Sequence, residues 1–226
     1  MSPAQIEAAA PANSRRVDVP DMLLACGVVG SPLFVGLSLV LASLRDGFDL
    51  SRHPFSLLSL GELGWVQIAN FAVSGLLFLA FAAGLTSRLR GGPGATTLPI
   101  AFAAMGVSLI GGGVFTADPA FAFPPGTPDG APATVSWHGA VHGVAFGVGM
   151  LALVAATALL ARRFLLTGKR GWGWYSLASG VVYLVLGGFG IATGDFRIVT
   201  VAIVVGWGWA AVVAAHLRRD PRPRGA

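Results

Sequence analysis

Two histidines, His138 and His142, lie four residues apart at the start of an apolar run, in the stretch SWHGAVHGVAFG (residues 136–147). In a helix, residues at this spacing share one face. Two imidazoles so placed can bind one metal ion, as they do in helical zinc sites. A zinc ion needs further ligands, and Asp118 is the candidate that we pair with the two histidines. Zinc is the only cofactor that these residues suggest.

A wider polar site is predicted around the same pair. It consists of His53, Glu62, Asp118, His138 and His142, which all flank apolar runs on what we expect to be one side of a membrane. Polar groups at a bilayer boundary need partners, and these residues are each other's nearest candidates. Three interpretations stay open: a metal site, a metal-free site for a lipid headgroup or small solute, and a purely structural hydrogen-bond network.

The composition explains why these residues stand out. Of the 226 residues, 54% are hydrophobic and only 11% are charged, whereas a soluble domain carries about 25% charged residues. The net charge of +5 does not indicate nucleic acid, because the basic residues lie in short segments beside apolar runs rather than in one patch. We therefore expect a multi-pass protein of the cell membrane, with membrane lipids as its partners. The oligomeric state stays open.

Six apolar runs of about the length that crosses a bilayer lie at residues 22–44, 63–86, 97–117, 136–161, 174–194 and 196–217. Within lipid the backbone must satisfy its own hydrogen bonds, which makes each run a helix. The predicted fold is an all-α bundle of six transmembrane helices. We expect a disordered cytoplasmic tail at 1–21, the transmembrane domain at 22–217 and a basic cytoplasmic tail at 218–226. The first run is longer than a signal-peptide core, so we interpret it as a retained helix.

The basic residues predict the orientation of this bundle. An even number of helices leaves both termini on one side, and Lys and Arg gather on the cytoplasmic side. Three arginines fall on the opposite side: Arg45, Arg52 and Arg197. The other twelve fall on the side of the termini: Arg15, Arg16, Arg88, Arg90, Arg162, Arg163, Lys169, Arg170, Arg218, Arg219, Arg222 and Arg224. Both termini are therefore expected in the cytoplasm.

Small and polar residues recur on single faces of the predicted helices. Gly139, Gly143 and Gly147 form a stripe that lets helices approach closely, so we expect a helix contact there. Two polar stripes predict either interhelical hydrogen bonds or a polar cavity. They are Gln67, Asn70 and Ser74 in the second run, and Ser176, Ser179, Tyr183, Gly187, Gly190 and Gly194 in the fifth.

Three segments of the chain resemble a known family. The stretch HPFSLLSLGELGWVQIANF (53–71), the loop DPAFAFPPG (118–126) and the pair His138 and His142 are similar to the bacterial membrane family labelled domain of unknown function, number 998. The resemblance covers about residues 22–217 and implies roughly six helices. It carries no catalytic residues, because the family's activity is not established.

A looser likeness is to membrane metal hydrolases, which include alkaline ceramidases and progestin/adipoQ-type receptors. These combine an HxxxH pair with a distant Asp, His and Ser around zinc, so the likeness implies Asp118, His138 and His142 as ligands and His53 as a third imidazole. Two features depart from that pattern. The pair lies on the fourth of six helices rather than on the last, and His53 falls in a loop before Pro54.

Two classes of function follow from these observations. The first is a non-enzymatic membrane protein whose outward-facing polar site binds a lipid headgroup or small solute. The second is a zinc-dependent hydrolase of a lipid amide or ester, in which bound metal lowers the pKa of its water to about 7. The sequence does not decide whether the protein is an enzyme.

Overall fold

The computed structural model describes residues 18–220, and within that range it contains six long helices and one short 3₁₀ helix. They are α1 (Val19–Leu44), η1 (Phe55–Ser59), α2 (Gly64–Arg88), α3 (Thr97–Val114), α4 (Trp137–Leu166), α5 (Arg170–Thr193) and α6 (Phe196–Arg219). Each of the six long helices is long and apolar enough to cross a membrane. The predicted all-helical fold is confirmed. Residues 1–17 and 221–226, where most of the two predicted tails falls, lie outside the described residues.

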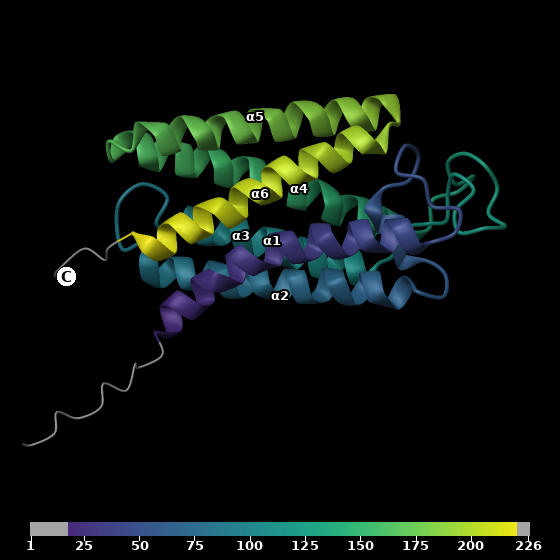
Figure 1. The fold of residues 1–226 in the computed structure, drawn as a ribbon, viewed down its shortest axis with the longest axis horizontal. Helices are drawn as coiled ribbons and strands as arrows, with labels where there is room; N and C mark the ends of the chain where they lie inside the picture. The colour runs from purple at the N-terminus through teal and green to yellow at the C-terminus, as the bar shows by residue number, and fades with distance from the viewer. Residues whose placement is uncertain (1–17, 221–226) are drawn as a thin grey trace, which may run out of the picture.

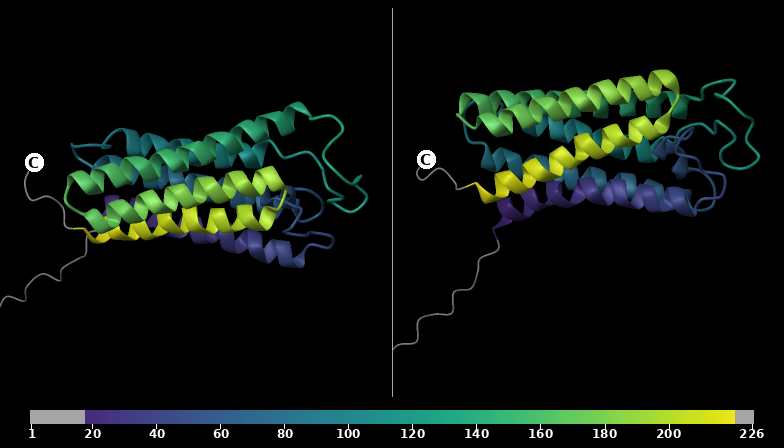
Figure 2. Two further views of the ribbon diagram at one scale, coloured as in Figure 1. Left: turned by 90° about the horizontal axis from the view of Figure 1, so that it is seen from above. Right: turned by 45° about the horizontal axis from the view of Figure 1, so that its top comes forward.

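The six helices form a closed ring (Figures 1 and 2). Each helix packs against its neighbours in the sequence, and α6 packs against α1. We call one end of the ring the basic end; it holds residue 18, the loops 89–96 and 167–169, and residue 220. The other end holds the loops 45–63, 115–136 and 194–195 and is called the capped end. Figure 1 shows the basic end at the left and the capped end at the right.

Local chemistry sets where several helices begin and end. Ser136 precedes α4, and its hydroxyl oxygen accepts a hydrogen bond from the Gly139 N–H at 3.0 Å, as a helix N-cap does. Asp195 caps α6 in the same way by accepting from the Arg197 N–H at 3.0 Å. Gly194 ends α5 with a φ of +73°, a conformation that glycine adopts without strain. The α5–α6 turn can therefore be very short.

Aromatic side chains fill the half of the ring nearest the basic end. Phe78, Phe81, Phe102 and Trp209 are all fully or almost fully buried. The Phe81 and Phe102 rings meet edge to face, with centroids 4.8 Å apart, a geometry that adds to the stabilisation from burial alone. The Trp209 Nε1–H donates to the Ser176 hydroxyl at 3.0 Å. This half of the bundle is therefore closely packed.

The polar stripe of α2 joins that helix to α1. Gln67 Nε2 donates to the Ser38 hydroxyl at 3.0 Å, and Asn70 Nδ2 donates to the Phe34 carbonyl oxygen at 3.1 Å. Ser74 donates to Asn70 Oδ1 at 3.4 Å. All four polar side chains are buried, so their partners satisfy groups that would otherwise be costly within a bilayer. Of the two predictions for this stripe, interhelical hydrogen bonding is confirmed.

The predicted contact of the glycine stripe on α4 is wrong. At Gly143 and Gly147 an added Cβ would meet nothing within 4 Å, so neither glycine lies against a neighbouring helix. Gly139 faces the Asp118 carboxylate, which a Cβ would displace. The close helix contact of α4 lies instead at Gly149, where an added Cβ would lie against the Ser108 hydroxyl of α3. Spacing alone did not distinguish a face that packs from a face that is open.

Candidate ligand-binding cavity

A cavity of about 290 Å³ occupies the half of the ring nearest the capped end. All six long helices and the segment Pro54–Ser56 contribute to its walls. Most of the lining is apolar or aromatic, and it contains no Asp, Glu, Lys or Arg. The aromatic part of the wall includes Phe34, Phe71, Phe146, Tyr183, Phe196 and Trp207. A mostly apolar wall with a few polar groups is typical of small-molecule sites.

The cavity exists because α4 and α5 separate toward the capped end, as both Figure 1 and Figure 2 show. Near mid-length the two helices touch, since Gly180 of α5 lies against Thr157 of α4. Beyond this point α4 follows α3, with Gly149 against Ser108. In contrast, α5 follows α6, with Gly190 against Val199. The two pairs of helices diverge and leave a wedge between them.

The wedge opens to the side of the bundle. Three residues of the cavity wall are exposed on the outer surface: Gly143 of α4, Phe146 of α4 (45% exposed) and Ile191 of α5 (46% exposed). All three belong to membrane-spanning helices, whose outer faces contact lipid tails rather than water. The opening therefore lies on a face of the bundle that would meet lipid in a membrane.

His142 is the histidine of the cavity wall. Its Nδ1 lies 2.8 Å from the Phe115 carbonyl oxygen and 3.1 Å from that of Gly112, both at the end of α3. A carbonyl oxygen only accepts hydrogen bonds, so Nδ1 carries a proton and donates it. The side chain is 9% exposed, and none of the described residues hydrogen-bonds its Nε2. This nitrogen is the one polar atom of the ring that a ligand can use.

Asp118 lies at the start of α4 rather than in the cavity wall. Its carboxylate accepts the Ser136 backbone N–H at 2.9 Å and rests on Gly139, the third residue of α4. Hydrogen bonds from the Ser136 hydroxyl and backbone hold the pKa of Asp118 below its usual value. A carboxylate there is also favoured by the positive end of the helix dipole. Asp118 therefore anchors the loop 115–136 to α4.

His53 connects two loops of the capped end. Its Nδ1 accepts a hydrogen bond from the Asp49 N–H at 2.8 Å, and its Nε2 donates to the Phe121 carbonyl oxygen at 2.8 Å. The ring is buried between Phe48 and Phe123, with centroids 5.2 and 5.4 Å away. Both nitrogens are thus occupied, and neither is free to bind a metal or a ligand in this arrangement.

The remaining two predicted site residues are exposed. His138 lies on the outer face of α4, with its ring 3.7 Å from that of Trp137. Glu62 lies in the turn before α2, and nothing among the described residues bonds to its carboxylate. The structure thus leaves His142 at the cavity and distributes the other four predicted residues over the loops and surface of the capped end.

Zinc binding stays a prediction. Within residues 18–220, no group of three or more His, Cys, Asp or Glu side chains is arranged so that it could hold a metal ion. Asp118 faces the α4 N-terminus, and His138 faces outward. The Nδ1 of His142 donates a hydrogen bond to a carbonyl oxygen at the end of α3. These three predicted ligands therefore point to different partners.

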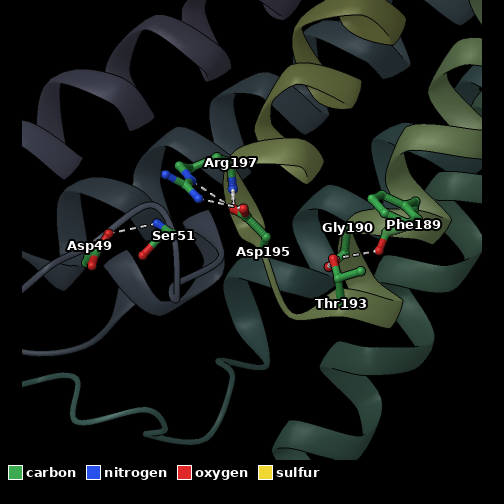
Figure 3. A network of polar contacts seen from close by, with 7 residues as sticks. All are labelled: Asp49, Ser51, Phe189, Gly190, Thr193, Asp195 and Arg197. Carbon is green, nitrogen blue, oxygen red and sulfur yellow. Dashed lines mark hydrogen bonds and ion pairs between the residues drawn. The ribbon is translucent and has the colours of Figure 1, made fainter.

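The loops of the capped end are bonded to one another beside the cavity. Figure 3 shows Asp49 accepting the Ser51 N–H, at 2.8 Å, beside the ion pair of Asp195 and Arg197. The bonds to Ser51 lower the pKa of Asp49. The Phe196 N–H donates to the Ser51 carbonyl oxygen at 3.3 Å, which ties the α5–α6 turn to the first loop. The exposed residues of the cavity wall lie at the side, between α4 and α5.

Sequence reasoning missed most of the cavity wall. Phe34, Phe146 and Trp207 are apolar residues in apolar runs, and nothing in the sequence distinguishes them from core or lipid-facing positions. One signal was available and was interpreted differently. Gly143 and Gly147 remove side chains from one face of α4, which can mark an opening as well as a helix contact.

Searches of curated proteins and of solved structures found no match. The likeness to membrane metal hydrolases therefore stays a hypothesis. A family model matches residues 28–216, which cover all of the cavity wall and every residue of the candidate site. The chain belongs to the membrane family described as "Protein of unknown function (DUF998)".

Proposed function

We propose that this protein binds a lipid-like amphiphile, which enters the cavity sideways from the membrane. The observation that carries the proposal is the opening between α4 and α5, where wall residues of an apolar cavity are exposed among lipid-facing helices. A solute from water would need a path through the capped end, where the loops are bonded to one another. A molecule already dissolved in the bilayer needs no such path.

The orientation completes the proposal. Basic residues gather at the ends of α2, α4, α5 and α6 and in the loops beside them, and the positive-inside rule assigns such an end to the cytoplasm. The capped end then faces outward, and the cavity opens into the outer leaflet of the cell membrane. The binding site is more apolar than the polar headgroup site predicted from the sequence, because the lipid's tail, rather than its headgroup, meets most of the wall.

Quenching of Trp207 by brominated lipid tests this function. Trp207 lines the cavity and is otherwise buried, whereas Trp209, two residues along α6, is fully buried away from it. The protein is reconstituted in nanodiscs of phosphatidylcholine with brominated or ordinary acyl chains. If chains enter the cavity, Trp207 contributes to the quenched part of the fluorescence and Trp209 does not.

The two tryptophans then give effects of opposite sign. Trp207→Phe should lower the quenched fraction of the total fluorescence, and Trp209→Phe should raise it. The exposed residues Trp65, Trp137 and Trp174 are quenched equally in both variants and cancel in the comparison. A rise in the quenched fraction for both variants would mean that lipid chains do not reach Trp207, and the proposal would be abandoned.

A further inference from the structure

His142 limits which polar group a ligand in the cavity can carry. The two carbonyl oxygens near Nδ1, those of Gly112 and Phe115, can only accept hydrogen bonds, so the N–H of an uncharged imidazole lies on Nδ1. The other nitrogen, Nε2, then presents a lone pair. A ligand must bring a hydrogen-bond donor to that atom, because an ether or ester oxygen would face another acceptor.

The rest of the wall provides no competing charge. Apart from His142, the side chains of the lining that can form hydrogen bonds are the hydroxyls of Ser56, Ser108, Tyr183 and Thr200 and the indole of Trp207. The Ser108 hydroxyl already donates to the Met105 carbonyl oxygen at 2.8 Å. A charged group in such a cavity would lose its hydration without gaining a counter-ion, which is costly. The polar group of the ligand is therefore uncharged.

We infer that the cavity selects an uncharged amphiphile whose polar group is a hydroxyl, with the hydroxyl donating to His142 Nε2 and the apolar body lying along the aromatic wall. This inference rests on the proposed function and adds the class of ligand and the residue that selects it. The donor is on the ligand and the acceptor is on the protein. Long-chain alcohols meet this requirement, whereas their ethers and the corresponding carboxylates do not.

Matched bromine probes test the selection. The probes are an octanol that carries bromine at its far end, the methyl ether of the same compound, and the corresponding bromo-octanoate. Each is titrated into the full-length protein in nanodiscs of ordinary lipid, and quenching of Trp207 is obtained as the difference between wild type and Trp207→Phe. We expect half-maximal quenching by the alcohol at about a fivefold lower membrane concentration than by the ether, which is the effect of one net hydrogen bond. The carboxylate should not quench Trp207.

Two substitutions assign the selection to His142. In His142→Phe the ring shape is kept and the acceptor is lost, so alcohol and ether should become equal. Thr200→Val removes another hydroxyl from the wall and should keep the fivefold preference. If His142→Phe does not fold, the comparison of alcohol and ether in wild type still decides the question.

The outcomes separate the two proposals. Equal quenching by alcohol and ether in wild type, or a preference for the ether, overturns the hydroxyl selection and leaves the proposed lipid cavity intact. Failure of both the alcohol and the ether to quench Trp207, together with failure of the brominated lipid, overturns the cavity function itself. A preference for the alcohol that survives in His142→Phe overturns the role of His142.

Discussion

At the scale of single residues, the histidines of the capped end differ in what their surroundings leave free. His53 uses both ring nitrogens to join two loops, and His142 uses one and keeps the other available. His138 lies outside against Trp137. The spacing of His138 and His142 was visible in the sequence, but the hydrogen-bond partners of His53 and His142 are backbone atoms of other segments. Only the folded loops could show which nitrogen is occupied.

His53→Ala should destabilise the protein, because it leaves the Asp49 N–H and the Phe121 carbonyl oxygen without their partner. A buried polar group that loses its partner costs about 1–3 kcal/mol. The matched control is His138→Ala, where the ring is exposed and has only aromatic contacts. The measurement is the free energy of unfolding in mixed micelles. Equal stability of the two variants would contradict the structural role of His53.

At the scale of elements, glycines decide where helices meet and where they separate. Gly180 of α5 allows contact with Thr157 of α4, and Gly149 of α4 allows contact with Ser108 of α3. Gly143 of α4 is also a glycine on a regularly spaced stripe, but a Cβ added there would meet nothing within 4 Å. The element boundaries followed well from hydropathy, because lipid makes every apolar run a helix. The direction in which each helix face points depends on neighbours, which the sequence does not specify.

Leucine substitutions distinguish the two kinds of glycine. Gly180→Leu would place its side chain into Thr157, and such overpacking typically costs about 1–3 kcal/mol. Gly143→Leu has open space and should leave the free energy of unfolding nearly unchanged. Since Gly143 borders the cavity opening, its leucine should also reduce the quenching of Trp207 by brominated lipid. Strong destabilisation by Gly143→Leu would instead restore the helix contact predicted from the sequence.

At the scale of the whole molecule, the ring has two chemically different ends. The basic end carries Arg and Lys from four helices and two loops, and the capped end carries the interlocked loops. By the positive-inside rule, this asymmetry predicts which leaflet the cavity faces. This prediction could be made from the sequence, because the distribution of Lys and Arg along the chain does not depend on how the helices pack, and it stays a prediction.

Cysteine labelling tests the orientation. Single cysteines at Ala131, in a loop of the capped end, and at Thr167, at the basic end, are both at exposed positions. They are introduced in a Cys26→Ser background, because Cys26 is the only native cysteine. An impermeant maleimide added to intact cells should label Ala131→Cys and should label Thr167→Cys only after the membrane is opened. The reverse pattern would place the capped end in the cytoplasm.

The contact between α1 and α6 has a consequence for how the chain can be rearranged. Asp21 and Arg218 form an ion pair at 2.7 Å, so the first and last helices are bridged at the basic end. A short linker can therefore join residue 220 to residue 18, and new termini can be opened in the loop 89–96 at the same end. Such a circular permutant retains every helix contact and an even number of crossings. The order in which the helices enter the membrane would change, while the ring they form would not.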